Sequence, residues 1–482
     1  MSNFFSFSHY YFVGLKGVAM TSLASCLISW GKKVSGTDIE EDFPTKENLE
    51  RLKLTCDFGF QHQLDNDIDC VIYTGAHGGS LNPIVLQAKN NNIACFSQAE
   101  ALSFLFNQKK GLAVCGVGGK STISAMLAFI LKKMGVDLSY SVGVGDILGL
   151  LKTGDFTKES KFFIAEADEY VDDPSVFAQT KIIVPRFSYL KPFLIICSNL
   201  RYDHPDVYAD FSQTKEIFLK FFKKISSNGY FIYSSDDQNL VQLIEQWGKT
   251  TSNLPKIISY GCNARADWQL VDFKVKNSCS VSKIKFKNKI YNLQLTIPGR
   301  YNATNSLAAL AAIECLDLNF NIIKSFQILK QFQSTKRRLE FLGEIHGCLY
   351  YDDYAHHPNE IVNVIQAIKQ WHPKRKITVA FQSHTFSRTK KLFFDFVAAF
   401  ALADQVVMTD IFASMREKFD KEISSTLLCR EIEKKFSHIK AQNLKTTKNL
   451  ALFCYKNLRE NDLLLCVGAG DIYHFFPQLK LL

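Results

Sequence analysis

The stretch "AVCGVGGKSTISAML", residues 113–127, decides the fold of the centre of this chain. It reads as an apolar strand that ends in a glycine-rich turn, followed by Lys120 and by an apolar helix. The first N–H groups of a helix have no partner within the helix, so a turn of this kind binds anions, and above all phosphate. The stretch therefore predicts a nucleotide-binding turn between a strand and a helix.

The turn is a shortened P-loop, GxxGKST, because Val114 stands where the formal pattern has its first glycine. The glycines allow the backbone to approach a phosphate closely, Lys120 supplies charge to the β- and γ-phosphates, and the next hydroxyls can reach Mg²⁺. The alternative is a plain strand–helix turn. The residues predicted to bind the nucleotide are Gly116, Val117, Gly118, Gly119, Lys120, Ser121 and Thr122.

Short apolar strands alternate with helical stretches along the 482 residues, which is typical of an α/β protein with parallel strands. Such units occupy the first hundred residues, start again near residue 110 and again near residue 333. Residues 268–298 alternate strand-like and polar positions, as in a small antiparallel meander. A chain of this length is expected to form about three domains.

The composition excludes several classes of protein. With 47% hydrophobic and 22% charged residues the chain is an ordinary globular protein, and no run of about 18 apolar residues could span a membrane. The net charge of +10 is dispersed and no nucleic-acid-binding motif occurs, so it favours anionic small substrates over nucleic acid. The 13 cysteines lack CxxC spacing and no signal peptide is evident, which favours reduced thiols and a cytoplasmic location.

Acidic and imidazole side chains follow the next two strands of the central unit. Glu166 ends the strand "FFIAE", and Asn199, Asp203 and His204 follow the strand "FLIIC". Because the carboxyl ends of parallel strands meet at one edge of a sheet, these groups are well placed to hold Mg²⁺ on ATP. Capping and turn chemistry is the alternative. Glu169 lies three residues beyond Glu166, a spacing that can turn its side chain away from the metal.

Motifs over nearly the whole chain resemble those of the Mur ligase superfamily, whose ATP loop reads GTxGK[ST]T and is followed by a Glu at a strand end and by NxxxDH. The motifs that carry the resemblance are "FVGLKGVAM" (12–20), "VSGTD" (34–38), "EADEY" (166–170), "GRYNATNSLAA" (299–309), "KRRLEFLGE" (336–344), "YDDYAHHPNEI" (351–361), "FQSHTFSRT" (381–389), "DIFASMRE" (410–417) and "GAGDI" (468–472). The chain departs from the family pattern at Lys16, Ala19, Val117, Gly118, Tyr301 and Ser383.

The resemblance implies an α/β fold of three domains: a Rossmann-like N-terminal domain (1–106) for the UDP-sugar, a central P-loop ATPase-like parallel sheet with the meander (107–332) for ATP, and a Rossmann-like C-terminal domain (333–482) that closes with the amino acid. Segments 381–389 and 410–417 are most similar to members that join L-alanine to UDP-N-acetylmuramate in peptidoglycan synthesis. The implied reaction uses ATP and Mg²⁺ and passes through an acyl phosphate. The expected form is a monomer or a homodimer.

The resemblance also implies a role for individual residues. Lys120, Glu166, His204, His384 and Arg388 would be catalytic, the last two on the carboxylate of the amino acid or on the acyl phosphate. Ser121 and Glu166 would bind one Mg²⁺ and His204 a second. ATP would contact the turn and also Asn302, Asn305, Arg337, Asp353 and His356. The UDP-sugar would contact Gly14, Gly17, Asp38 and His357.

Other interpretations stay open. Asp38 can be a turn residue, Asn302 can cap a helix, and the turn with His356 and His357 can hold a metal. "GAGDI" can be a purely structural turn. For the whole chain, the alternatives are a related ligase that attaches recycled tripeptide to UDP-N-acetylmuramate, and a P-loop ATPase that makes no amide.

Overall fold

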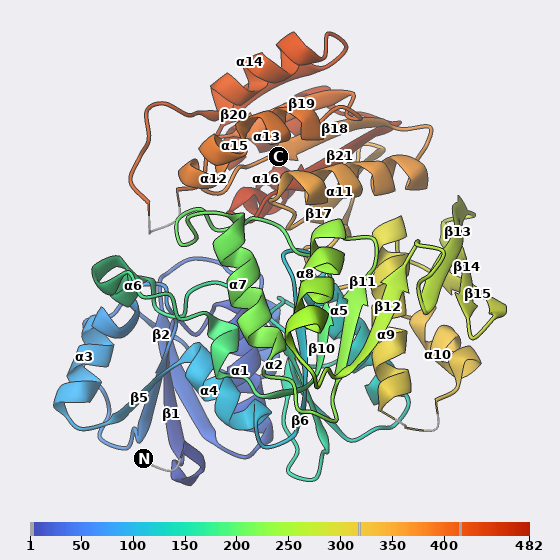
Figure 1. The fold of residues 1–482 in the computed structure, drawn as a ribbon. Helices are drawn as coiled ribbons and strands as arrows, with labels where there is room; N and C mark the ends of the chain where they lie inside the picture. Colours follow the sequence, from blue (N-terminus) through green and yellow to red (C-terminus); the bar gives the residue numbers. More distant parts are fainter. Residues whose placement is uncertain (1–3, 317, 319, 414–416) are drawn as a thin grey trace.

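The computed structural model describes residues 4–316, 318, 320–413 and 417–482, so residues 414–416 of the segment "DIFASMRE" lie outside the described part. The structure contains three sheets, each formed by one stretch of the chain (Figure 1). The three-domain α/β fold class expected from the sequence is confirmed, whereas the boundaries at 106 and 332 stay predictions.

The N-terminal sheet has the order β3-β2-β1-β4-β5, and all its neighbouring strands are parallel. Its strands are β1 (His9–Val13), β2 (Lys33–Asp38), β3 (Asp57–Phe58), β4 (Cys70–Tyr73) and β5 (Ala94–Ser97). Its helices are α1 (Val18–Ser29), α2 (Lys46–Arg51), α3 (Pro83–Asn90) and α4 (Gln98–Phe106), with the 3₁₀ helices η1 (Phe4–Ser6) and η2 (Gly79–Leu81). β1 is central and buried along its length, which explains its run of aromatic and aliphatic residues after His9.

The central sheet has the order β15-β14-β13-β12-β11-β10-β6-β9-β7-β8. Its strands are β6 (Lys110–Cys115), β7 (Leu138–Ser141), β8 (Gly154–Asp155), β9 (Phe162–Glu166), β10 (Pro192–Cys197), β11 (Tyr230–Ser234), β12 (Lys256–Gly261), β13 (Trp268–Lys276), β14 (Cys279–Phe286) and β15 (Lys289–Leu295). Its helices are α5 (Lys120–Lys133), α6 (Pro174–Thr180), η3 (Arg186–Tyr189), α7 (Phe211–Phe222), α8 (Gln238–Thr250), α9 (Arg300–Cys315) and α10 (Ile322–Leu329). The predicted meander is β13–β15, and it extends the central sheet through the pairing of β13 with β12.

Both faces of β6 are buried, and this fixes the strand at the middle of the central domain. Leu112 and Val114 face a core that contains residues of α5 and α9, whereas Ala113 and Cys115 face a second core. Because successive side chains of a strand point to opposite faces, a strand covered on both sides has an uninterrupted apolar run. The glycine turn at the end of β6 is therefore held on a rigid element.

The C-terminal sheet has the order β16-β17-β21-β18-β19-β20 and is parallel except for the pair β16–β17. Its strands are β16 (Glu340–Ile345), β17 (Cys348–Asp353), β18 (Lys376–Phe381), β19 (Gln405–Thr409), β20 (Lys440–Lys445) and β21 (Asp462–Val467). Its helices are α11 (Pro358–Trp371), α12 (Phe386–Lys391), α13 (Phe393–Ala399), α14 (Ser425–Lys435), α15 (Thr447–Asn457), η4 (Ile472–His474) and α16 (Phe475–Lys480).

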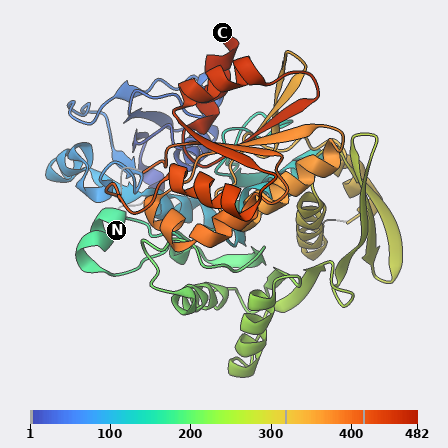
Figure 2. The same cartoon turned by 90° about the horizontal axis from the view of Figure 1, so that it is seen from above.

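The C-terminal domain lies across the other two domains, over the region where they meet (Figure 2). It touches the N-terminal domain where Tyr473 Oη donates a hydrogen bond to the carbonyl of Asp42, at 3.0 Å. Lys336, which leads into β16, forms an ion pair of 2.8 Å with Glu47 of α2. The three domains therefore form a closed arrangement. Within the described ranges, no helix is both long and apolar enough to cross a membrane.

Helix α1 joins the N-terminal domain to the edge of the central sheet. Ser25 Oγ donates to the carbonyl of Gly154 at 2.6 Å, and Ser22 Oγ donates to the carbonyl of Thr153 at 3.0 Å. The approach is so close that a Cβ on Gly154 would lie 2.0 Å from the carbonyl oxygen of Ser22. Small side chains on α1 and a glycine on β8 are thus what lets the two domains pack.

We expect Gly154→Ala to weaken this packing, because the backbone of α1 must move away from β8. Overpacking of this kind typically costs about 1–3 kcal/mol of unfolding free energy. Urea unfolding followed by tryptophan fluorescence measures the loss, with Gly248→Ala in α8 as the control, since a Cβ there meets its nearest atom at 3.7 Å. Equal midpoints for Gly154→Ala and the wild type would contradict the tight junction.

Candidate active site

The glycine turn lies between β6 and α5, as the sequence predicts. Gly116 has a φ of 115° and Gly119 a φ of 86°, which are left-handed conformations that favour glycine. Gly119 is also the N-cap of α5, so the helix begins at Lys120. The unpaired N–H groups at the start of α5 therefore lie beside the glycine turn. The local geometry is that of an anion site.

Lys120 is partly buried and paired with acidic side chains. Its Nζ lies 2.9 Å from Glu169 Oε2 and 3.9 Å from Asp168 Oδ1. Burial alone would lower the pKa of Lys120, but the two carboxylates outweigh burial and raise it, so the ammonium stays charged. Glu169 therefore faces the turn, against the expectation that its spacing from Glu166 could turn it away.

Ser121 and Glu166 form one polar contact, as expected of two groups assigned to the same ion. Ser121 Oγ donates to Glu166 Oε2 at 3.1 Å, and the N–H of Gly143 donates to Oε1 at 2.9 Å. Burial raises the pKa of the Glu166 carboxyl. Arg338 approaches from the C-terminal domain and donates to Ser121 Oγ at 3.4 Å.

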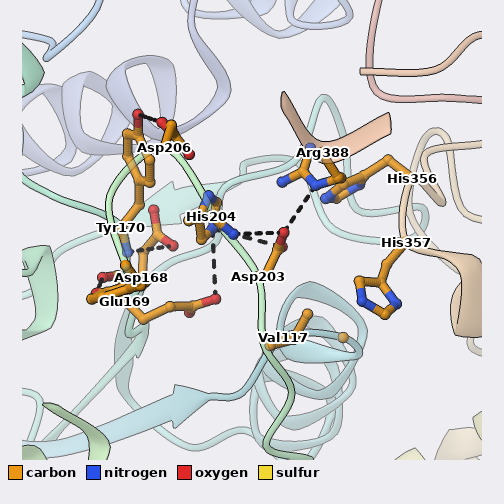
Figure 3. A network of polar contacts seen from close by, with 12 residues as sticks. Val117, Asp168, Glu169, Tyr170, Asp203, His204, Asp206, His356, His357 and Arg388 are labelled. Carbon is orange, nitrogen blue, oxygen red and sulfur yellow. Dashed lines mark hydrogen bonds and ion pairs between the residues drawn. The ribbon is translucent and has the colours of Figure 1, made fainter. Parts of the chain in front are cut away.

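A second acidic group gathers around His204, which follows β10 (Figure 3). Asp168, Glu169 and His204 each offer one ligand atom, and these atoms lie within 4.8 Å of one another. Glu169 Oε1 is buried and has no hydrogen-bond partner, and it lies 3.8 Å from His204 Nε2. Two carboxylates and an imidazole with an unpartnered buried oxygen fit a divalent cation. Of the predicted metal ligands, Ser121 and Glu166 therefore lie in one group and His204 in the other.

Asp203 and Arg388 form a buried ion pair that joins the central and C-terminal domains (Figure 3). Arg388 Nε lies 2.9 Å from Asp203 Oδ1. Burial opposes the charge on Asp203, but His204 and Arg388 hold its pKa well below the usual range. His384 lies beside this pair, because Arg388 Nη1 donates to its carbonyl oxygen and lies 3.3 Å from its Nδ1. The two residues predicted for the amino acid are thus together.

A first cavity opens between the glycine turn, α9 and the C-terminal domain. Its lining includes Val117, Gly118, Gly119, Thr122, Asn199, Tyr301, Asn302, Asn305, Arg338, Asp353, His357 and Glu360.

Two polar residues of this lining are held by the backbone. Asn302 does not cap α9, since the N-cap is Gly299, and its Nδ2 instead donates to the carbonyl of Pro298 at 2.7 Å. Asp353 accepts hydrogen bonds from the N–H groups of Leu339 and Ala355, while burial raises its pKa to about 6.

A second cavity is bounded by all three domains. Its lining includes Val18, Ala19, Pro44, Val117, Lys120, Ser121, Glu166, Asp168, Glu169, Asp203, His204, Arg337, Arg338, Tyr354, His356 and Glu360. Val117, Arg338 and Glu360 line both cavities, so the cavities meet at the glycine turn. The N-termini of α1 and α5 therefore face one space, although they belong to different domains.

Three residues of the C-terminal domain lie in different surroundings, and their predicted contacts with ATP or the sugar substrate stay predictions. His356, predicted for ATP, lines the second cavity, and His357, predicted for the sugar substrate, caps α11 and lines the first. Arg337 donates hydrogen bonds to Asp352 Oδ2, 2.9 Å from its Nε, and to the carbonyl of Gly468, 2.6 Å from its Nη2. Both arginines lie in the turn before β16, where Arg337 has a φ of 60°. Arg337 binds groups of the C-terminal domain, whereas Arg338 also lines the first cavity. Sequence reasoning missed Arg338, although it stands in the same "KRR" motif.

The "GAGDI" turn has a structural role, because it supplies the carbonyl that Arg337 binds and its Asp471 accepts from Gln382 Nε2 at 2.6 Å. The turn with His356 and His357 gives no metal cluster among the described residues, where Asp168, Glu169 and His204 are the group of this kind.

The first glycine loop, between β1 and α1, is held by Asp38. Asp38 Oδ2 accepts from the N–H of Lys16 at 2.7 Å and Oδ1 accepts from the N–H of Ile39 at 2.8 Å. Gly14 has a φ of 88°, and a Cβ there would lie 2.4 Å from Thr74 Cγ2. Gly17 is the N-cap of α1. Asp38 thus shapes the loop as a turn residue would, and its contact with a uridine stays a prediction.

The chain belongs to the Mur ligase family, whose domains match each of its three parts. Residues 9–110 match the Mur ligase family catalytic domain, residues 114–313 the Mur ligase middle domain, and residues 337–470 the Mur ligase glutamate ligase domain.

Within this family, the chain is 35% identical over 477 residues to the UDP-N-acetylmuramate–L-alanine ligase of Clostridium kluyveri, with 96% of each chain covered. Among solved structures, the UDP-N-acetylmuramate–alanine ligase of Thermotoga maritima has a TM-score of 0.77 at 24% identity, and a murein peptide ligase of Psychrobacter arcticus has a TM-score of 0.71 at 20% identity. Both alignments cover 98% of each chain, and at these identities they show the shared fold.

We expect Glu166→Ala and His204→Ala each to raise the Mg²⁺ concentration needed for activity, because each removes a ligand atom from one of the two groups. Phosphate release titrated against Mg²⁺ should give curves shifted to higher concentration. Asp206→Asn is the matched control, since Asp206 accepts from Tyr170 Oη at 2.7 Å beside the His204 group and is not a member of it. Unshifted curves with normal rates would remove Glu166 and His204 from the metal sites.

Proposed function

We propose that the protein joins L-alanine to the carboxylate of UDP-N-acetylmuramate at the expense of ATP, as a step of peptidoglycan precursor synthesis. The observation that carries this proposal is the meeting of two cavities at the glycine turn, one reaching toward Asn302 and Asn305 and the other bounded by three domains. A nucleotide triphosphate in the first cavity and a carboxylate substrate in the second would bring the two reacting groups together beside Lys120.

ATP would lie in the first cavity, with its phosphates on the glycine turn. The free N–H groups at the start of α5 would bind the phosphates, and Lys120 would neutralise the charge that spreads over the transferring group. Asn302 and Asn305 line the inner wall of this cavity on α9, and an amide side chain suits an adenine because it both donates and accepts. Arg338 would add a second positive charge from the opposite domain.

Mg²⁺ would be held by the Ser121–Glu166 pair and by the group of Asp168, Glu169 and His204. When bound, it supplies positive charge to the phosphates and orients them for transfer. The carboxylates of Glu166 and Glu169 carry pKa values raised by burial, which shows the unfavourable desolvation that a cation at either place would relieve.

The chain's own groups organise the reaction in two steps. The carboxylate of the muramyl group attacks the γ-phosphorus of ATP, the bond to ADP breaks, and an acyl phosphate forms. The neutral amine of L-alanine then attacks the acyl carbon and loses a proton to the departing phosphate or to solvent. The acyl C–O bond breaks, phosphate leaves with the electron pair, and the amide is formed. Lys120 would stabilise the transferring phosphoryl, and Arg388 would bind the carboxylate of L-alanine through the guanidinium donors that Asp203 and His384 do not take.

A ligase for recycled tripeptide is the second candidate. The solved murein peptide ligase shares the fold, but the full-length relative at 35% identity is an L-alanine ligase. Incubation of the protein with ATP, Mg²⁺ and UDP-N-acetylmuramate, together with either L-alanine or the tripeptide, tests the choice. Phosphate release with L-alanine supports the proposal, release with the tripeptide alone selects the other ligase, and release without any acceptor indicates an ATPase.

We expect Lys120→Ala to lower turnover by about a thousandfold or more, because the charge on the transferring phosphoryl group loses its closest cation. Binding of UDP-N-acetylmuramate, measured by calorimetry, should remain, since its nucleotide would lie on the first glycine loop. Lys132→Ala is the control at the other end of α5, where Lys132 pairs with Asp155 at 2.9 Å. An equal loss of sugar-nucleotide affinity in Lys120→Ala would argue against separate nucleotide sites.

We expect Arg388→Ala to raise the KM for L-alanine, because it removes a charge-assisted hydrogen bond worth roughly 1.5–3 kcal/mol. The acyl phosphate should still form, so hydroxylamine added with ATP and UDP-N-acetylmuramate should trap a hydroxamate in similar yield in the variant and the wild type. Asp203→Asn separates the two roles of Arg388, because it breaks the ion pair and keeps the guanidinium. A joint loss of hydroxamate in both variants would assign Arg388 to domain closure instead.

The acyl phosphate itself is tested with oxygen-18 in the muramyl carboxylate. The label should appear in the released phosphate, since the carboxylate oxygen bridges to phosphorus in the intermediate. Amide formation at a normal rate without label in the phosphate would contradict the mechanism.

A further inference from the structure

The first half of the glycine turn is bound to the end of β10. Asn199 Oδ1 accepts hydrogen bonds from the N–H of Val117 at 3.0 Å and from the N–H of Gly118 at 3.1 Å. Asn199 Nδ2 donates to the carbonyl of Gly118 at 2.9 Å, and Ser198 Oγ donates to the same carbonyl. One carboxamide therefore satisfies three backbone groups of the turn.

The packing between the turn and residues 198–199 is as close as these hydrogen bonds require. A Cβ on Gly116 would lie 2.4 Å from Ser198 Oγ and 2.9 Å from the backbone nitrogen of Asn199. A Cβ on Gly118 would lie 3.6 Å from Asn199 Nδ2. The lack of a side chain at Gly116 therefore lets residues 198–199, which follow β10, pack against the turn.

The direction of the Gly118 carbonyl decides whether the turn can bind an anion. A carbonyl oxygen that pointed toward a phosphate would repel it, because both carry negative charge. The contacts from Ser198 and Asn199 hold this oxygen toward β10. The donors of Val117 and Gly118 are also occupied, so the N–H groups at the start of α5 are the ones presented to a ligand.

The side chain at position 117 explains why the turn needs this support. Val117 is apolar and offers no hydrogen bond that would fix the turn from within. Asn199 is partly buried, follows the end of β10 by two residues and lines the first cavity, so the central sheet positions its carboxamide beside the turn. The sequence had instead grouped Asn199 with the residues that could hold Mg²⁺.

We propose that Asn199 is a positioning residue for ATP, which fixes the 116–118 backbone so that its carbonyl faces away from the phosphates, and that it acts on the turn and not on the metal. The proposal rests on the proposed function only in placing ATP at this turn. It assigns to Asn199 an effect on nucleotide affinity that is independent of Mg²⁺.

Calorimetry with the β,γ-imido analogue of ATP tests this, once with Mg²⁺ and once with EDTA. Asn199→Ala removes all three contacts, and Asn199→Asp keeps the acceptor but loses the donor to Gly118 and adds a negative charge. Both variants should bind the analogue at least tenfold more weakly in both conditions. Affinity for UDP-N-acetylmuramate should be unchanged, and the thermal midpoint without ligand should stay within a few degrees of the wild type.

Asn239→Ala is the matched control, because Asn239 Nδ2 donates to the carbonyl of Leu200, next to Asn199, and does not contact the turn. Unchanged affinity for the analogue in the Asn199 variants would overturn the proposal. A loss seen only with Mg²⁺ would also overturn it, since it would make Asn199 a metal-side residue. A joint loss of both ligands with a lowered midpoint would show a general structural role.

The result of this binding experiment does not depend on which acceptor the protein uses. The binding experiment contains no acceptor, so a protein that uses the tripeptide in place of L-alanine gives the same result for Asn199. A wild-type protein that binds no ATP analogue would overturn both proposals.

Discussion

Charges buried in a protein must be paired, and the candidate active site is arranged around this requirement. Lys120 is paired with Glu169, and Arg388 is paired with Asp203 across the domain boundary. Both cations are also the groups proposed for anionic substrates. The acidic partners therefore keep each cation charged and fixed in the absence of substrate, at the edge where the phosphates and the carboxylates would enter.

The same requirement couples the site to the arrangement of the domains. The Asp203–Arg388 pair links the end of β10 to α12, and Arg338 reaches Ser121 from the other side of the domain boundary. Neither cavity is complete in a single domain, because residues of the central and C-terminal domains line the first and residues of all three line the second. The site is therefore assembled where the domains meet.

Parallel sheets explain why such a site can be built from distant motifs. The turn after β6, the carboxylates after β9 and His204 after β10 all lie at the carboxyl edge of one sheet, where these three strands are neighbours. α1 brings its N-terminus to the same space because small residues let it pack against β8. The N-termini of α1 and α5 therefore line one cavity from two domains.

The sequence by itself determined the three α/β units, the glycine turn and its helix, the meander and the family, because these depend on local periodicity and on contiguous motifs. It also predicted site roles for Glu166, His204, Asn302 and Asn305, which line the two cavities, and for Arg388, which pairs with Asp203. It could not say which way single side chains point. Only the tertiary structure decided that Glu169 pairs with Lys120, that Arg337 binds Asp352 and the carbonyl of Gly468, and that His356 and His357 line different cavities. These residues lie in loops and turns outside the strands, so their directions depend on the partners that other elements and domains bring to them and not on a local repeat.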